Sequence, residues 1–186
     1  MTFKNKSIKN PKELLNKSEI SIIIDDYEDI FSDFDPRPFS HRALSDDFLI
    51  EAKRASADKS IEDLELKFLL PAHERRLSQE KIIRRRLREH FIRHFNIQLK
   101  EKFKILRKGS SFLVAGIIFM MITTFLLYKF HESSLGLSFL IILLEPAGWF
   151  SFWEGLNILF FESKHVNPDL DFYKKMAHVK ISFWTY

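Results

Sequence analysis

Two apolar runs near the C-terminus constrain this chain of 186 residues more than any other feature. They extend over 112–128 and 135–161, with only six residues between them. With its flanking residues the first run is ~20 residues long, which as a helix matches the ~30 Å hydrocarbon core of a bilayer. Because a second long run follows at once, a buried core helix is disfavoured. The pattern predicts a transmembrane hairpin over 110–161, with spans at 110–130 and 135–161.

The second run contains an acid, Glu145, about ten residues from its outer end and therefore near the middle of the bilayer. An ionisable group at that depth costs roughly 2.5–3.5 kcal/mol on insertion scales. Three interpretations stay open: a structural acid hydrogen-bonded to a neighbouring helix or to free backbone, a member of an ion or proton pathway, or an interfacial residue without a special role. A second acid, Glu154, lies near the inner interface, where a charge costs less.

Pro146 follows Glu145 directly, lacks an amide hydrogen and disfavours a helical conformation at the residue before it. The sequence therefore predicts a kink or break over Glu145, Pro146, Ala147 and Gly148. Ala147, Ser151 and Gly155 form a stripe of small residues that favours close approach of another helix, either from a second copy or from the first span. Trp149 and Trp153 form a parallel stripe, which we interpret as packing or interfacial anchoring.

Charge sets the expected orientation. Lys and Arg residues precede the first span and follow the second, whereas the intervening turn has one Lys. The positive-inside rule then places both termini in the cytoplasm of a multi-pass protein of the inner or cell membrane. No apolar segment follows the basic N-terminus, so a cleaved signal peptide is not expected. The chain has no Cys, which excludes disulfides, thiolate metal sites and Cys nucleophiles.

The rest of the chain predicts a small cytosolic domain of the α/β or α+β class. Residues 20–24, 64–70 and 179–183 alternate or are rich in branched apolar residues, as in strands. A helix capped by Ser45 separates the first two, which suggests a parallel crossover. If all three strands join one sheet, the hairpin is an insertion before the last helix and strand of this domain.

A long helix is predicted from Ser78, as its N-cap, to about Lys108, with Leu77 and Ile82 as a hydrophobic staple. It could continue directly into the first span, with a bend at Gly109. After the second span, Asn167 and Pro168 have the pattern of a helix start. The expected organisation is a disordered tail (1–18), the α/β domain (19–108), the hairpin (110–161), and a returning helix and strand (162–186).

An acidic stretch follows the first predicted strand. From Glu19 to Asp35 there are seven acids and no Lys or Arg. Carboxylates at the carboxyl end of a strand could bind a divalent cation such as magnesium or calcium, with Asp25, Asp26 and Asp29 as candidate ligands. The spacing fits no helix–loop–helix calcium loop, so a solvated acidic loop is the favoured interpretation, and no cofactor is predicted.

The long helix is strongly basic, with eleven Lys or Arg against two Glu from Lys81 to Lys108. A solvated or intramolecular face is the first interpretation, and contact with anionic lipid is the second. Nucleic-acid binding is disfavoured because regular apolar spacing shows that one side of the helix is packed. The candidate lipid contacts are Arg84, Arg85, Arg88, Lys104, Arg107 and Lys108.

No catalytic residue can be assigned from the sequence. His90 and His94 are one helical turn apart, but the zinc-protease pattern is absent because Phe91 follows the first His. The leading hypothesis is therefore a non-enzymatic, homo-oligomeric membrane protein that could conduct ions or small solutes through Glu145. The alternatives are a membrane-anchored scaffold or signalling adaptor, and a membrane-associated enzyme that depends on a divalent cation.

Overall fold

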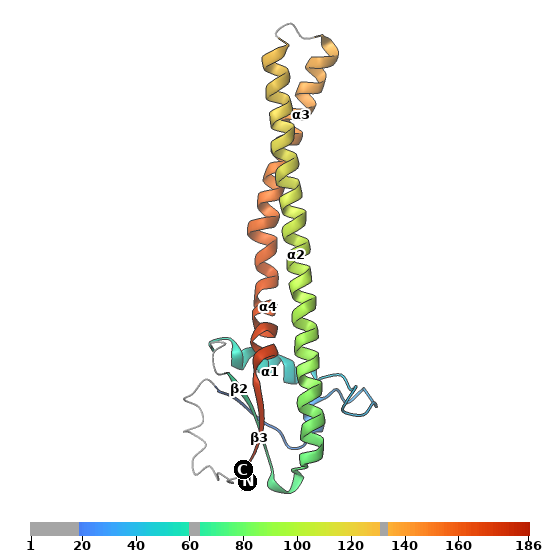
Figure 1. Ribbon diagram of the computed structural model, residues 1–186, viewed down its shortest axis with the longest axis vertical. Helices are drawn as coiled ribbons and strands as arrows, with labels where there is room; N and C mark the ends of the chain where they lie inside the picture. Colours follow the sequence, from blue (N-terminus) through green and yellow to red (C-terminus); the bar gives the residue numbers. More distant parts are fainter. Residues whose placement is uncertain (1–18, 60–63, 131–133) are drawn as a thin grey trace. The chain divides into compact units, whose positions relative to one another are not determined.

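The computed structural model describes residues 19–59, 64–130 and 134–186; the tail predicted at 1–18 lies outside the described residues. The described chain is mostly helical and contains a small parallel sheet (Figure 1). It divides into two compact units. The first comprises residues up to Phe95 together with Asp171–Tyr186, and the second is Asn96–Leu170.

The sheet of the first unit has three strands: β1 (Glu19–Ile23), β2 (Glu65–Leu70) and β3 (Lys180–Thr185). They lie in the order β1-β2-β3, and both pairs are parallel. Phe68 is opposite Ile22 on one side and Phe183 on the other. The prediction that strands before and after the apolar runs share one sheet is confirmed, because β2 precedes those runs and β3 follows them.

Three helices contribute to the core of this unit. Helix α1 (Asp46–Ser56) follows Ser45, as predicted, although the Ser45 side chain makes no capping hydrogen bond. Aromatic rings continue the contacts across the sheet, with centroid distances of 5.7 Å for Phe48–Phe68 and 5.2 Å for Phe68–Phe183. Helices α2 and α4 add further buried apolar side chains: Ile83, Leu87, Phe91, Phe172 and Met176.

Helix α2 (Leu77–Lys129) is one uninterrupted helix of 53 residues. Its continuation into the first apolar run agrees with the prediction, and the bend at Gly109 stays a prediction. The predicted start is wrong: the amides of Gln79 and Glu80 donate to the carbonyl of Arg76, so the helix begins before Ser78. Leu77 is 70% exposed and Ile82 44% exposed, and no hydrophobic staple forms.

The second apolar run forms helix α3 (Leu135–Asn157), which passes into a π-helix, η4 (Ile158–Glu162), and then into α4 (Ser163–His178). Helix α3 is continuous through Pro146, so the predicted break is wrong, and the alternative, a kink, stays a prediction. Apolar helices tolerate Pro when neighbouring groups satisfy the backbone. The predicted helix start at Asn167 is also wrong. Its side chain instead accepts a hydrogen bond of 2.8 Å from Lys102 Nζ.

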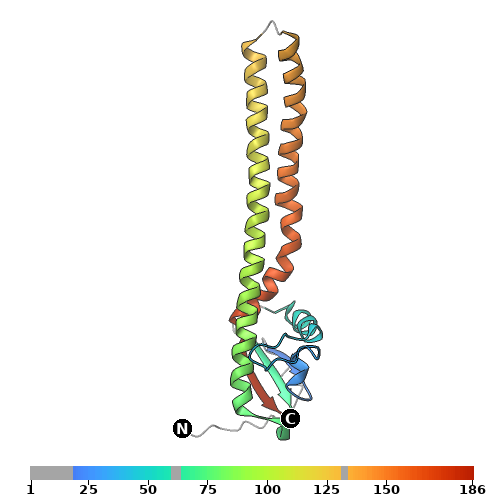
Figure 2. The same ribbon diagram turned by 90° about the vertical axis from the view of Figure 1, so that its right-hand side faces the viewer.

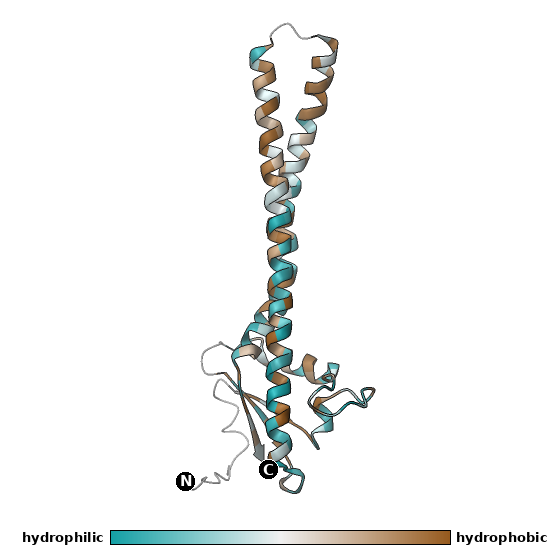
Figure 3. Ribbon diagram, turned by 45° about the vertical axis from the view of Figure 1, so that its right-hand side comes forward, coloured by the Kyte–Doolittle hydropathy of each residue, from teal (hydrophilic) through white to brown (hydrophobic). Residues whose placement is uncertain are grey.

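Two helical stretches, one within Leu77–Lys129 and one within Leu135–His178, are long and apolar enough to cross a membrane by length and composition. Figure 2 shows α2 and α3 side by side, and Figure 3 shows the concentration of apolar residues along both. Only 11% and 6% of the apolar windows are buried, unlike the core helix of a soluble protein. Both helices therefore present apolar side chains outward.

Candidate functional site on the apolar helices

Glycines bring the backbones of α2 and α3 into direct contact. A Cβ atom added at Gly116 of α2 would lie 2.5 Å from the amide nitrogen of Phe152, and one added at Gly155 of α3 would lie 2.6 Å from that of Leu113. No side chain fits at such distances. The two remaining members of this contact, which we call the glycine seam, are Gly109 and Gly148; all four residues are buried.

The glycine seam revises the interpretation of the small-residue stripe. Gly155 and the half-buried Ser151 belong to the side of α3 that packs against α2, and Gly148 is buried more fully than Ala147. Small residues therefore serve contact between the two helices of one chain. The stripe gives no support for contact between copies.

Glu145 lies outside this seam, on an exposed surface of α3. With Pro146, Trp149, Phe150 and Trp153 it lines a shallow groove of about 540 Å³, which we call the Glu145 groove. The two tryptophan rings are stacked, with centroids 6.1 Å apart. Pro146 has no amide hydrogen, so it cannot donate the usual helical hydrogen bond to the carbonyl of Ile142, four residues earlier. The groove therefore combines a carboxyl group with two aromatic faces.

The other apolar helix has no comparable group. A groove of similar size on α2 is lined by apolar side chains with Thr124 and Tyr128. The hydroxyls of Thr123 and Thr124 donate to the carbonyls of Phe119 and Met120, at 2.9 and 2.8 Å. Their polarity is thus satisfied within their own helix, which leaves Glu145 as the acid of an exposed groove. Glu154, the second predicted acid, is half-buried and does not line that groove.

Two of the candidate lipid-contact arginines have intramolecular partners in the first unit. Arg84 donates to Glu80 at 2.8 Å and Arg85 to Glu89 at 2.7 Å. Arg88 is exposed. In the second unit Lys104, Arg107 and Lys108 are all exposed. The candidate lipid contacts thus separate into paired arginines and an exposed basic group beside the apolar part of α2.

Glu80 is the most deeply buried acid among the described residues, with 1% of its surface exposed. It accepts from Arg75 and Arg84, each at 2.8 Å. The Tyr27 hydroxyl is 3.5 Å from the same carboxylate and accepts from the amide of Arg76 at 3.0 Å. Burial raises the pKa of Tyr27. This cluster ties the start of α2 to the segment after β1.

The acidic stretch uses its carboxylates to order its own backbone. Asp29 accepts from the amides of Asp25 and Asp26, at 2.7 and 3.4 Å. Asp26 in turn accepts from the amide of Glu28 at 2.6 Å. No group of three or more His, Asp or Glu side chains suited to a metal occurs in the described part of the chain. The geometry therefore indicates a self-capped loop.

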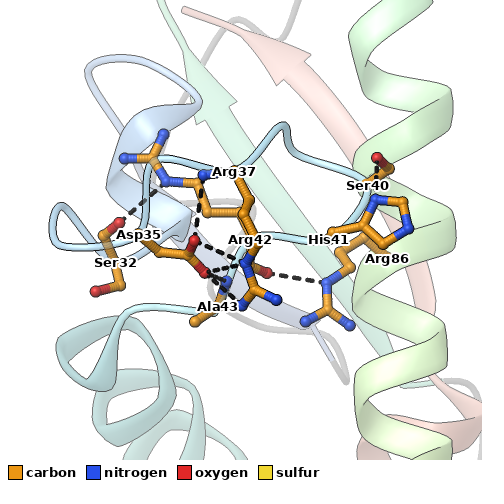
Figure 4. A network of polar contacts seen from close by, with 8 residues as sticks. All are labelled: Ser32, Asp35, Arg37, Ser40, His41, Arg42, Ala43 and Arg86. Atoms are coloured by element: carbon orange, nitrogen blue, oxygen red, sulfur yellow. Dashed lines mark hydrogen bonds and ion pairs between the residues drawn. The ribbon is translucent and has the colours of Figure 1, made fainter.

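A second part of this stretch is joined to the basic helix, as Figure 4 shows. Asp35 accepts three hydrogen bonds from the Arg37 guanidinium, at 2.7, 2.8 and 3.1 Å, and one from the amide of Ala43 at 2.7 Å. The Arg37 guanidinium holds the pKa of the Asp35 carboxyl well below its usual range. Arg42 pairs with Glu28, and its carbonyl accepts from Arg86 Nε at 2.9 Å. Arg42 therefore links the acidic stretch to the basic helix, through its side chain on Glu28 and its carbonyl on Arg86.

His90 and His94 form a stack and not a chelate. Their ring centroids are 4.2 Å apart at an interplanar angle of 28°, and His94 stacks on Tyr173 at 5.2 Å. Nearly parallel rings direct their nitrogens into separate planes, so they cannot converge on one ion. Burial, with smaller contributions from His94, Arg86 and Arg93, lowers the pKa of His90 to about 4. The pair is neutral packing at pH 7.

Two features of the apolar helices were missed from the sequence. The glycines recur at seven-residue spacing on each helix, Gly109 with Gly116 and Gly148 with Gly155, and this spacing could have revealed the seam. The π-helix at Ile158–Glu162 has no such signal. Comparison of the chain with models of protein families, with curated proteins and with solved structures finds no match.

Proposed function

We propose that the chain crosses the membrane as a two-helix hairpin with both termini in the cytoplasm, and that several copies assemble so that Glu145 lines a path for cations. The observation that carries this proposal is the exposure of Glu145 on the apolar surface of α3. A carboxyl group facing hydrocarbon is costly, and such groups face a bundle interior or a wet cavity. The Glu145 carboxyl must therefore contact a second copy of the chain or water.

Packing within one chain means that conduction would require several copies. The glycine seam closes the space between α2 and α3, so a single hairpin has no room for a conduit. A path would have to form between hairpins, where rings of carboxyl groups attract cations. The Glu145 groove, which is apolar apart from its carboxyl group, is the surface that such an arrangement would enclose.

Ion flux through reconstituted protein tests this proposal. Glu145→Gln, which keeps the shape and removes the charge, should abolish flux or alter cation preference, whereas the matched variant Glu154→Gln should retain flux. Native mass spectrometry in lipid nanodiscs should detect at least four copies. A monomer, or flux that Glu145→Gln leaves unchanged, would refute conduction.

A membrane-anchored adaptor is the second candidate, and the exposure of Phe34 favours it. Phe34 is 99% exposed between Asp33 and Asp35, at the edge of the acidic loop. An aromatic side chain presented so fully suits contact with a soluble basic partner. Binding of a soluble basic partner would be measured in two variants. The adaptor is supported over the conduit if binding is retained when the hairpin is exchanged for an unrelated one and is lost in Phe34→Ala.

A further inference from the structure

The π-helix η4 creates a small groove at the cytoplasmic end of α3. Trp153, Leu156, Asn157, Phe160 and Phe161 line it, and it holds about 140 Å³. Phe160 and Phe161 are 60% and 63% exposed. π-Helical turns widen a helix locally and occur frequently at functional sites. This surface, which we call the inner groove, is apolar apart from the Asn157 amide.

Exposed cations lie at the same level as the inner groove. A Cβ atom at Gly109 would lie 2.9 Å from the side chain of Leu159, and Lys102 Nζ bonds to Asn167 at 2.8 Å. Because the two helices are antiparallel, these contacts place Lys108 level with Phe160 of the groove, and Lys104 level with Lys164, which is one turn further along the helix from Phe160. The set that we call the basic collar is Lys104, Arg107, Lys108 and Lys164, all exposed.

We infer that the inner groove and the basic collar together bind an anionic phospholipid of the cytoplasmic leaflet. One acyl chain would lie along Phe160 and Phe161, and the phosphate would contact Lys104 and Lys164. The apolar groove matches the acyl chain of such a lipid, and the cations match its headgroup. Basic residues near a membrane attract anionic headgroups, and their apolar stems let the charge reach the interface. The nearby acid Glu162 is half-buried, whereas the collar is exposed. This inference rests on the membrane insertion proposed above and not on conduction.

Native mass spectrometry of the full chain, with phosphatidylglycerol and phosphatidylcholine offered separately, tests the site. The unaltered protein should retain phosphatidylglycerol preferentially, and added salt should weaken that retention. Lys104→Gln with Lys164→Gln should reduce it about 10-fold or more. The matched control, Lys81→Gln with Lys174→Gln, removes the same charge from exposed lysines of the other unit and should have no effect.

Two further measurements keep the outcomes distinct. Phe160→Ala with Phe161→Ala should weaken retention without removing its salt dependence. Resistance to carbonate extraction, measured on every variant, reports membrane insertion independently; its failure in the unaltered protein would refute the proposed insertion itself. Equal retention of both lipids by the inserted protein, or retention that the collar variant leaves unchanged, would overturn the lipid site. If the collar variant does not fold, the lipid preference and salt dependence of the unaltered protein decide.

Discussion

Gly116 of α2 lies against the backbone of Phe152 of α3, so closely that a Cβ atom at position 116 would be 2.5 Å from the Phe152 amide nitrogen. Main-chain atoms cannot move aside as a flexible side chain can. In lipid the hydrophobic effect does not drive apolar helices together, so they associate through close packing of their backbones. The contact therefore holds the hairpin together and assigns its opposite surfaces to other interactions.

Gly116→Ala and Gly155→Ala should each destabilise the hairpin by about 1–3 kcal/mol, the usual cost of overpacking. The added methyl group meets main chain in both cases. Unfolding in detergent, followed by thermal denaturation or protease resistance, measures the effect. Gly136→Ala is the matched control, because nothing lies within 4 Å of a Cβ at that position. Equal stability of all three variants would show that the seam does not form.

Glu80→Gln should lower the free energy of unfolding by about 1.5–3 kcal/mol, the usual worth of hydrogen bonds to charged groups. The reason is that its carboxylate, 1% exposed, accepts from both Arg75 and Arg84. Chemical denaturation measures the change. Glu89→Gln breaks an exposed pair with Arg85 and should cost less than about 1 kcal/mol. A reversed order of the two variants would contradict the role of Glu80.

Stability should fall as the pH drops from about 6.5, the ordinary pKa of His, to about 4, the pKa of His90 in the folded protein. Over this range the unfolded chain binds a proton that the folded chain excludes, so acid favours unfolding; above it both states are neutral and the contribution is fully retained. Denaturation at a series of pH values measures the slope. His90→Phe should flatten this slope, because phenylalanine does not titrate. The substitution breaks no hydrogen bond of the buried Nε2, which has no partner among the described residues. An unchanged slope would contradict this assignment.

Asp29→Ala should destabilise the first unit by about 0.5–2 kcal/mol, as loss of a capping side chain does. Its carboxylate accepts from the amides of Asp25 and Asp26. Asp25→Ala, which leaves both hydrogen bonds in place, is the matched control and should be nearly neutral. The melting temperature should not respond to added magnesium or calcium. A metal-dependent rise that Asp25→Ala abolishes would instead restore the cation site.

The strands and the long basic helix could be predicted because their signals are local. Alternation of apolar residues at 64–70 depends on which face of a strand is buried, and an apolar residue every fourth position from Ile83 marks a packed helical side. Helix boundaries were less predictable. Ser78 has a favourable capping side chain, but backbone hydrogen bonds to Arg76 start the helix before it. Asn167 lies inside α4, and its side chain accepts from Lys102 instead of capping a helix.

Two long apolar helices, with Glu145 in the second, could be predicted from the order of the residues, since length, hydropathy and the position of one acid are properties of the chain alone. Which surfaces of those helices meet follows from their packing in three dimensions. Gly148 and Gly155 pack inward because backbone contact requires the absence of a side chain, and that packing leaves Glu145, Trp149 and Trp153 outside. Which residues face each other depends on two helices together, and no periodicity within one of them contains that information.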